Sequence, residues 1–146
     1  MFFMKSRMIL LAFVICGNWT LSGCGGGPSG PLPVEQLNDV KLREIGDLYR
    51  AYQIAKKTPP KKLKDFEPFA TVTLTAYEML RNGTVIVRYG ATLPDTEEEP
   101  KTTGSNEVLA YLKEVPTSGG PVLMLDRSTR HMSAEEFKNA KLAGTD

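Results

Sequence analysis

The sequence has few of the side chains on which metal sites and many enzymes depend. It contains one histidine, His131, and two cysteines, Cys16 and Cys24. A structural zinc site needs a tetrahedral set of ligands, mostly cysteine and histidine, so the chain offers too few of them. It also has no glycine-rich phosphate loop and no dinucleotide-binding turn. We therefore expect no metal, no cofactor and no enzyme activity.

Few candidates for catalysis are left once these sites are excluded. Ser128 and Ser133 lie close to His131 in the sequence. At that spacing in a hairpin, serines are expected to cap the turn and the following helix. The paired carboxylates of glycoside hydrolases approach each other in space, so the sequence does not identify such a pair. A hydrolase with dispersed carboxylates is accordingly the third alternative for function.

The chain also lacks a strong charge of either sign and a long apolar run. Its formal net charge is +1, which gives no general attraction for nucleic acid. The apolar run at residues 8–15 is less than half of the roughly 20 residues that a membrane-spanning helix needs. It follows Lys5 and Arg7, with no acidic residue before it. This is the pattern of a secretory signal.

The signal ends in Leu21-Ser22-Gly23-Cys24, which resembles the lipobox of bacterial lipoprotein precursors. The resemblance implies that a diacylglycerol is attached to the Cys24 thiol and that residues 1–23 are removed as a signal peptide. Two or three acyl chains hold a protein stably at a membrane. We expect an anchor in the periplasmic side of the outer membrane or the outer face of the inner membrane. An ordinary signal peptide with a cysteine at its cleavage site is the alternative.

Cleavage before Cys24 would leave a chain without an internal disulfide. Residues 24–146 carry 16 basic and 17 acidic residues, a net charge of −1. Residues 24–33 are rich in glycine and proline, which predicts a flexible tether. Residues 34–142 are then expected to form a single domain, followed by a disordered tail at 143–146.

Residues 34–57 are predicted to form an amphipathic helix. Three- and four-residue spacings place its main apolar residues on one face: Leu42, Ile45, Leu48, Tyr49, Tyr52 and Ala55. Pro59-Pro60 ends the helix. We expect the apolar face to pack on the sheet of the same domain, with a second protein or a membrane surface as the alternative.

The remaining elements are predicted to be short. A helix is expected at 74–82, with Thr75 and Glu78 forming a capping box. Strands are expected at 84–91, 107–115 and 121–126, and a last helix opens with Ser133 and Glu136. Short connections favour antiparallel pairing. The expected class is therefore α+β, with a long N-terminal amphipathic helix packed on a small antiparallel sheet of three or four strands and a short C-terminal helix.

The C-terminal part carries a distinctive pattern. Its residues are Gly119, Gly120, Val122–Asp126, Met132, Ser133 and Glu135–Phe137, with Tyr49 and Pro59-Pro60 earlier in the chain. They resemble small secreted proteins, common in planctomycete-type bacteria, that end in a Gly-Gly turn, an Asp-Gly hairpin and a Ser/Thr-x-Glu-Glu-Phe helix. The order of elements is similar to that of pilin-like and pseudopilin-like domains. The resemblance implies a fold and a location, and it assigns no activity.

One residue departs from that pattern at the hairpin. Asp126-Arg127 replaces Asp-Gly. A tight type I′ turn requires positive φ angles, which glycine adopts easily and arginine does not. We therefore expect a wider turn that uses Ser128 and Thr129.

Two charged clusters are candidate binding surfaces. The lysine patch, a candidate ligand or partner site, consists of Lys56, Lys57, Lys61, Lys62 and Lys64. The acidic loop contains Asp95, Glu97, Glu98 and Glu99. Such oxygen ligands suit Ca²⁺, but the loop lacks the glycine and the alternating spacing of a calcium loop, and we interpret it as a solvated loop.

The expected function is that of a non-catalytic, lipid-anchored envelope protein, a structural or protein-interaction module. Its expected partners are the membrane, through Cys24, and another envelope protein or a second copy of the chain, but not nucleic acid. The alternative is a module that binds cell-wall glycan or another acidic polymer through the lysine patch.

Overall fold

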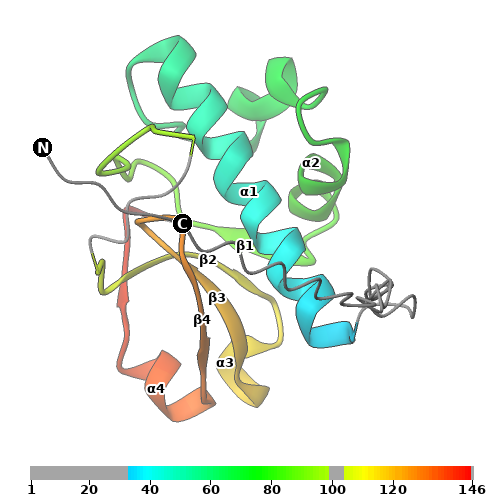
Figure 1. Cartoon of the computed structure of the whole chain (residues 1–146), viewed down its shortest axis with the longest axis vertical. Helices are drawn as coiled ribbons and strands as arrows, with labels where there is room; N and C mark the ends of the chain where they lie inside the picture. Colours follow the sequence, from blue (N-terminus) through cyan, green and yellow to red (C-terminus); the bar gives the residue numbers. More distant parts are fainter. Residues whose placement is uncertain (1–32, 99–103, 146) are drawn as a thin grey trace, which may run out of the picture. The chain divides into compact units, whose positions relative to one another are not determined.

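A long helix packs against a mainly antiparallel sheet in the computed structural model of this chain (Figure 1). The structure describes residues 33–98 and 104–145, so the predicted signal peptide, Cys24 and most of the tether lie outside the described residues. The expected α+β class is confirmed. In chain order the elements are α1 (Val34–Lys56), the 3₁₀ helix η1 (Leu63–Phe69), α2 (Leu74–Arg81), β1 (Val85–Val87), β2 (Glu107–Leu112), α3 (Val115–Ser118), β3 (Gly120–Met124), β4 (Thr129–Met132), α4 (Ala134–Lys138) and β5 (Lys141–Leu142).

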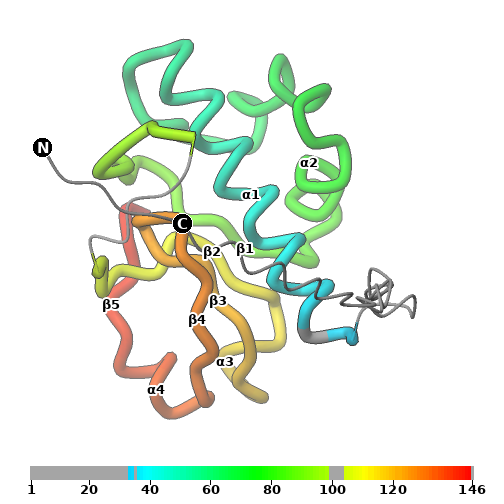
Figure 2. The backbone as a smooth tube through the Cα atoms, viewed as in Figure 1, coloured from blue at the N-terminus to red at the C-terminus, as the bar shows by residue number. Residues whose placement is uncertain are grey.

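The sheet is organised around β2. Strands β1, β2, β3 and β4 follow one another and pair antiparallel. On the side of β2 away from β3, β1 pairs with residues 110–112, and β5 pairs in parallel with residues 107–108 (Figure 2). The sheet therefore has five strands, where three or four were expected. Strand β5 was not predicted because two residues carry no alternating pattern.

Helix α1 buries one face against the sheet, η1 and α2. Leu42, Ile45, Leu48 and Tyr49 are fully buried in this face, and each buried aliphatic side chain contributes about 1.5–3 kcal/mol. Ala55, which the spacing places on the same face, is exposed. The helix ends at Lys57, whose φ of 57° is left-handed and whose N–H donates to the Gln53 carbonyl.

Aromatic rings fill the space between the C-terminal half of α1 and η1. Tyr49, Tyr52, Phe66, Phe69 and Tyr89 form a chain of ring contacts, with centroids 5.5–6.2 Å apart. The Tyr49 hydroxyl donates a buried hydrogen bond of 2.7 Å to the Ala91 carbonyl. Burial raises the pKa of Tyr49 well above its ordinary value.

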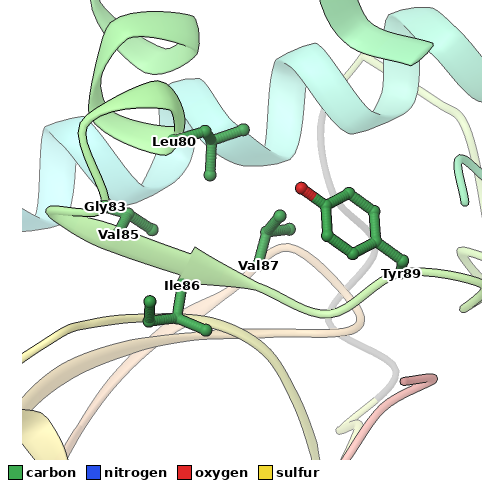
Figure 3. A pocket seen from close by; sticks show the side chains of 6 residues that line it. All are labelled: Leu80, Gly83, Val85, Ile86, Val87 and Tyr89. Atoms are coloured by element: carbon green, nitrogen blue, oxygen red, sulfur yellow. The ribbon is translucent and has the colours of Figure 1, made fainter. Parts of the chain in front are cut away.

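The opposite side of the sheet is covered near its end by α4. Figure 3 shows Val87 and Ile86 pointing to opposite sides of β1, as strand geometry requires. Tyr111, the partner of Ile86 on β2, contacts the Phe137 ring of α4 at 4.6 Å. The predicted capping box of this helix is confirmed, because Ser133 Oγ accepts from the Glu136 N–H and the Glu136 carboxylate accepts from the Ser133 N–H.

Two local predictions in the middle of the chain are wrong. Helix α2 has no Thr75–Glu78 capping box, because Thr73 is the N-cap and Glu78 pairs with Arg81. The strand expected at 107–115 stops at Leu112. Residues 115–118 instead form α3. Pro116 lies in the first turn of this helix, where backbone N–H groups have no partner within the helix, so the missing N–H of proline costs no hydrogen bond.

Residues 143–145 pair with other segments of the fold where a disordered tail was expected at 143–146; Asp146 lies outside the described residues. Tyr89 and Thr145 exchange two backbone hydrogen bonds of 2.7 Å. Ala143 is fully buried, and its N–H donates to the Val108 carbonyl. The expected strand 84–91 is correspondingly short: the Arg88 N–H still donates to the Leu109 carbonyl of β2, but Tyr89 pairs with Thr145 of this C-terminal segment. Arg88 holds the junction between β1 and β5 by donating to the Ala143 and Gly144 carbonyls.

Candidate functional site

The most unusual polar residue of the described structure is Arg127, in the β3–β4 hairpin. Its side chain and backbone are only 5% exposed, and its φ is 65°. The hairpin loop, residues 125–128, is wider than a two-residue turn and includes Ser128, as expected, but Thr129 lies in β4 and not in the turn. The conformation that glycine would favour is nevertheless adopted by Arg127, which the sequence did not predict. A non-glycine residue held at positive φ needs compensation from its contacts.

Those contacts come from the acidic loop. Arg127 Nη2 lies 3.1 Å from Asp95 Oδ1, and the guanidinium also donates to the carbonyls of Glu97 and Glu98. The interpretation of this loop as simply solvated is therefore wrong for Asp95, which is largely buried. Glu97 and Glu98 keep exposed side chains. Glu99 lies outside the described residues.

A second buried carboxylate shapes the same hairpin. Asp126 is 1% exposed and accepts hydrogen bonds from the Ser105 N–H, the Ser128 N–H and the Ser128 hydroxyl, at 2.6–3.1 Å. Burial by itself would raise the pKa of Asp126. The hydrogen bonds from Ser128 and Ser105 outweigh burial, so the pKa lies below its ordinary value.

The histidine lies apart from these carboxylates. His131 is half exposed on β4, and its Nε2 is 3.6 Å from Asp39 Oδ1 of α1. The two nearby serines have other partners, since Ser128 donates to Asp126 and Ser133 caps α4. The structure therefore does not bring a serine together with His131.

The lysine patch surrounds the connection between α1 and η1. Lys56 ends α1, Lys57 caps it, and Lys61, Lys62 and Lys64 lie before or within η1; all five are exposed. In the described part of the chain, none of the five forms an ion pair within 4.0 Å. The connection itself is fixed, because Asp65 accepts from the Lys61 and Lys62 N–H groups and the Pro60 carbonyl accepts from Gly90. The patch is thus a solvated cationic surface on a rigid base.

The described surface has two notable hollows. One lies between the end of α2 and β1 and is lined by Leu80, Gly83, Val85, Ile86, Val87 and Tyr89 (Figure 3). The other lies on α1 and is lined by Gln36, Asp39, Val40 and Arg43. Neither contains the Arg127–Asp95 pair or the lysine patch.

Across 33–98 and 104–145, no three histidine, cysteine, aspartate or glutamate side chains are grouped closely enough to bind a metal ion. No helix in these ranges is both long and apolar enough to cross a membrane.

No family model, no curated protein and no solved structure matches this chain. Its residues and their geometry are therefore the basis for a functional proposal. The Arg127–Asp95 pair was missed by sequence reasoning, although arginine at the glycine position of the hairpin was a signal that this turn is unusual.

Proposed function

We propose that this protein is a non-catalytic, lipid-anchored protein of the cell envelope, and that its pilin-like domain serves as a structural or protein-interaction module. The long helix α1 on a small sheet supports the pilin-like interpretation. The Leu21–Cys24 sequence supports the anchor. In this proposal Cys24 carries the lipid, at the outer membrane or the outer face of the inner membrane.

The observation that carries the non-catalytic part of the proposal is the use of the buried polar groups. Arg127, Asp126 and Tyr49 each bond to backbone or side-chain groups of the fold. An active site instead directs such groups into a cavity where a substrate could bind. These three groups join loops and strands, which is a structural role.

Lipid labelling tests the anchor. In cells that express the full chain and are fed a radioactive fatty acid, we expect label on the wild-type protein and none on the Cys24→Ala variant. Cys16→Ala is the matched control, because Cys16 lies within the predicted signal, and it should be labelled normally. Normal labelling of the Cys24→Ala variant would contradict the anchor.

Crosslinking in the native cells tests the interaction module. We expect a reproducible partner, or a crosslinked second copy, when the full-length protein is recovered from envelopes. A protein that is strictly monomeric and carries no crosslinked partner would contradict this part of the proposal.

The lysine patch favours a second candidate function, binding to a cell-wall glycan or another acidic polymer. Five exposed lysines that form no ion pair with any described residue make a surface that polyanions can contact without first breaking internal bonds. Changing Lys61 and Lys62 to Gln should reduce salt-sensitive retention on isolated cell wall. Changing Lys113 and Lys138, which are also exposed, is the control with the same loss of charge. Equal retention of both variants would contradict this function.

A further inference from the structure

Large apolar side chains are exposed on the N-terminal half of α1 and at the start of α2, which lies beside the middle of α1. Val34, Leu37 and Val40 lie on the first turns of α1 and are 41–73% exposed. Val72 and Leu74, at the start of α2, are 55% and 65% exposed. We call these five residues the apolar patch. Single exposed apolar residues are normal on protein surfaces, but grouped ones indicate an interaction site.

A hydrogen bond brings the two halves of the apolar patch together. Thr73 Oγ1 donates to the Glu44 carbonyl at 3.5 Å. Leu37 and Val40 precede Glu44 by seven and four residues, so all three lie on one side of α1. Thr73 has an extended backbone, with φ of −144° and ψ of 91°. In an extended segment, neighbouring side chains point to opposite sides, so those of Val72 and Leu74 point away from the contact of Thr73 with α1. They are therefore exposed on the surface beside α1.

The position of the apolar patch in the chain indicates what covers it. Only nine residues separate Cys24 from Val34, the first residue of α1. At about 3.3 Å per extended residue, they span at most roughly 30 Å. A lipid on Cys24 would thus keep the N-terminal end of α1 near the bilayer. The other end of α1, near Ile54, lies about 30 Å from Val34 and about 15 Å from Glu44, the residue that Thr73 contacts, at ~1.5 Å per residue along the helix.

We infer that the apolar patch rests on the surface of the bilayer that holds the anchor, with its side chains in the boundary between headgroups and acyl chains. This inference depends on the lipid anchoring proposed above. Residues 24–146 have a net charge of −1, so the contact relies on apolar burial and not on general attraction to anionic lipid. The tether makes even a weak contact effective, because it holds the patch at a high local concentration near the membrane.

Tryptophan fluorescence in lipid vesicles tests this orientation. The chain has a single tryptophan, Trp19, inside the predicted signal. In the full chain with Trp19→Phe, a new tryptophan is introduced by Leu74→Trp or, as the control on the far end of α1, by Ile54→Trp. Ile54 is also exposed, at 39%. Each protein is purified from membranes and reconstituted into phosphatidylcholine vesicles with or without brominated acyl chains.

We expect brominated lipid to remove most of the emission of the Leu74→Trp variant and to leave that of the Ile54→Trp variant unchanged. Val72→Trp is a second patch variant, in case Leu74→Trp does not fold. Equal quenching of the two variants, or no quenching of either, would overturn the orientation. A third outcome would also overturn it: emission that brominated lipid does not quench and that shifts to the blue as the protein concentration rises. That result would indicate that a second copy of the chain covers the patch. Mass spectrometry of the peptide that contains Cys24, from the same preparation, shows separately whether the lipid is attached. A missing lipid would contradict the anchor, whereas an attached lipid without quenching at the patch would contradict only the orientation.

Discussion

The guanidinium of Arg127 and the carboxylate of Asp95 lie 3.1 Å apart although the residues are 32 positions apart in the chain. Both side chains are largely buried, so the pair fastens the β3–β4 hairpin to the segment that follows β1. The aliphatic stem of Arg127 also lies beside Gly46 of α1, where an added Cβ would meet it at an ordinary van der Waals distance of 3.6 Å. Arg127 therefore lies where the hairpin, the acidic loop and α1 meet.

Arg127→Met should destabilise the protein by about 3–5 kcal/mol, because it leaves the Asp95 charge buried without its partner. The measurement is the free energy of unfolding from urea titration. Arg81→Met is the control, since Arg81 pairs with Glu78 at 3.3 Å on the surface, where an ion pair contributes about 0–1 kcal/mol. Similar losses of unfolding free energy in both variants would show that the Arg127–Asp95 pair stabilises the protein no more than a surface ion pair does.

Asp126→Asn should lower stability at neutral pH by about 1.5–3 kcal/mol, because hydrogen bonds to a charged acceptor are stronger than those to a neutral one. The folded pKa of Asp126 lies below its unfolded value of about 3.9. Its contribution is therefore complete above pH ~4 and is lost as the pH falls through the folded pKa. Urea unfolding at pH 7 and pH 3 should show the difference between wild type and variant shrinking at the lower pH. The same change at exposed Asp47 is the control, and a pH-independent difference would contradict the prediction.

Tyr49→Phe should cost about 1 kcal/mol at neutral pH, the usual value of one hydrogen bond, here the bond to the Ala91 carbonyl. It should also make the protein less sensitive to alkali. Burial raises the folded pKa of Tyr49 above its unfolded value of about 10, so the wild type loses this contribution as the pH rises above ~10. Thermal unfolding between pH 8 and pH 11 measures the slope. An unchanged slope in the variant would contradict this role.

Gly144→Ala should break the pairing of the C-terminal segment with Tyr89. Gly144 has a φ of 51°, and a Cβ there would collide with the Tyr89 carbonyl. Gly90→Ala is the matched control, because Gly90 has a φ of 74° but no atom within 4 Å of the added Cβ. The control should lose about 1–2 kcal/mol from backbone strain alone. Gly144→Ala should lower the free energy of unfolding by more than the control does, and it should accelerate amide hydrogen exchange at Tyr89 and Thr145. Equal losses of stability in the two variants would show that the structure relieves the collision.

Local signals in the sequence predicted local structure well. Ser133 and Glu136 are three residues apart and form their capping box whatever the rest of the fold does. The helix expected at 74–82 is observed at 74–81, and the glycine after it was a correct signal, although the Thr75–Glu78 capping box that also indicated it does not form. The α+β class followed from the order of such short patterns.

Contacts between distant residues could not be predicted in this way. Nothing in the Asp95 segment indicates that one of its carboxylates meets Arg127, because the pairing depends on where β1 and β3 place their loops. The same holds for β5, whose two residues form a strand only because β2 offers them an unpaired edge. Pro116 was expected to end a strand, but it opens α3, since proline suits both positions and only the surrounding fold decides between them.

The parallel pairing of β5 with β2 has a consequence for the order of events in folding. Lys141 and Leu142 follow the other strands of the sheet in the described chain, yet they complete the edge of the central strand, and Thr145 pairs with Tyr89. These long-range contacts form only once residues 141–145 are present, and pairings of this kind slow folding. A chain of which only the residues before Lys141 are available would therefore keep a sheet in which residues 107–108 of the central strand lack their parallel partner.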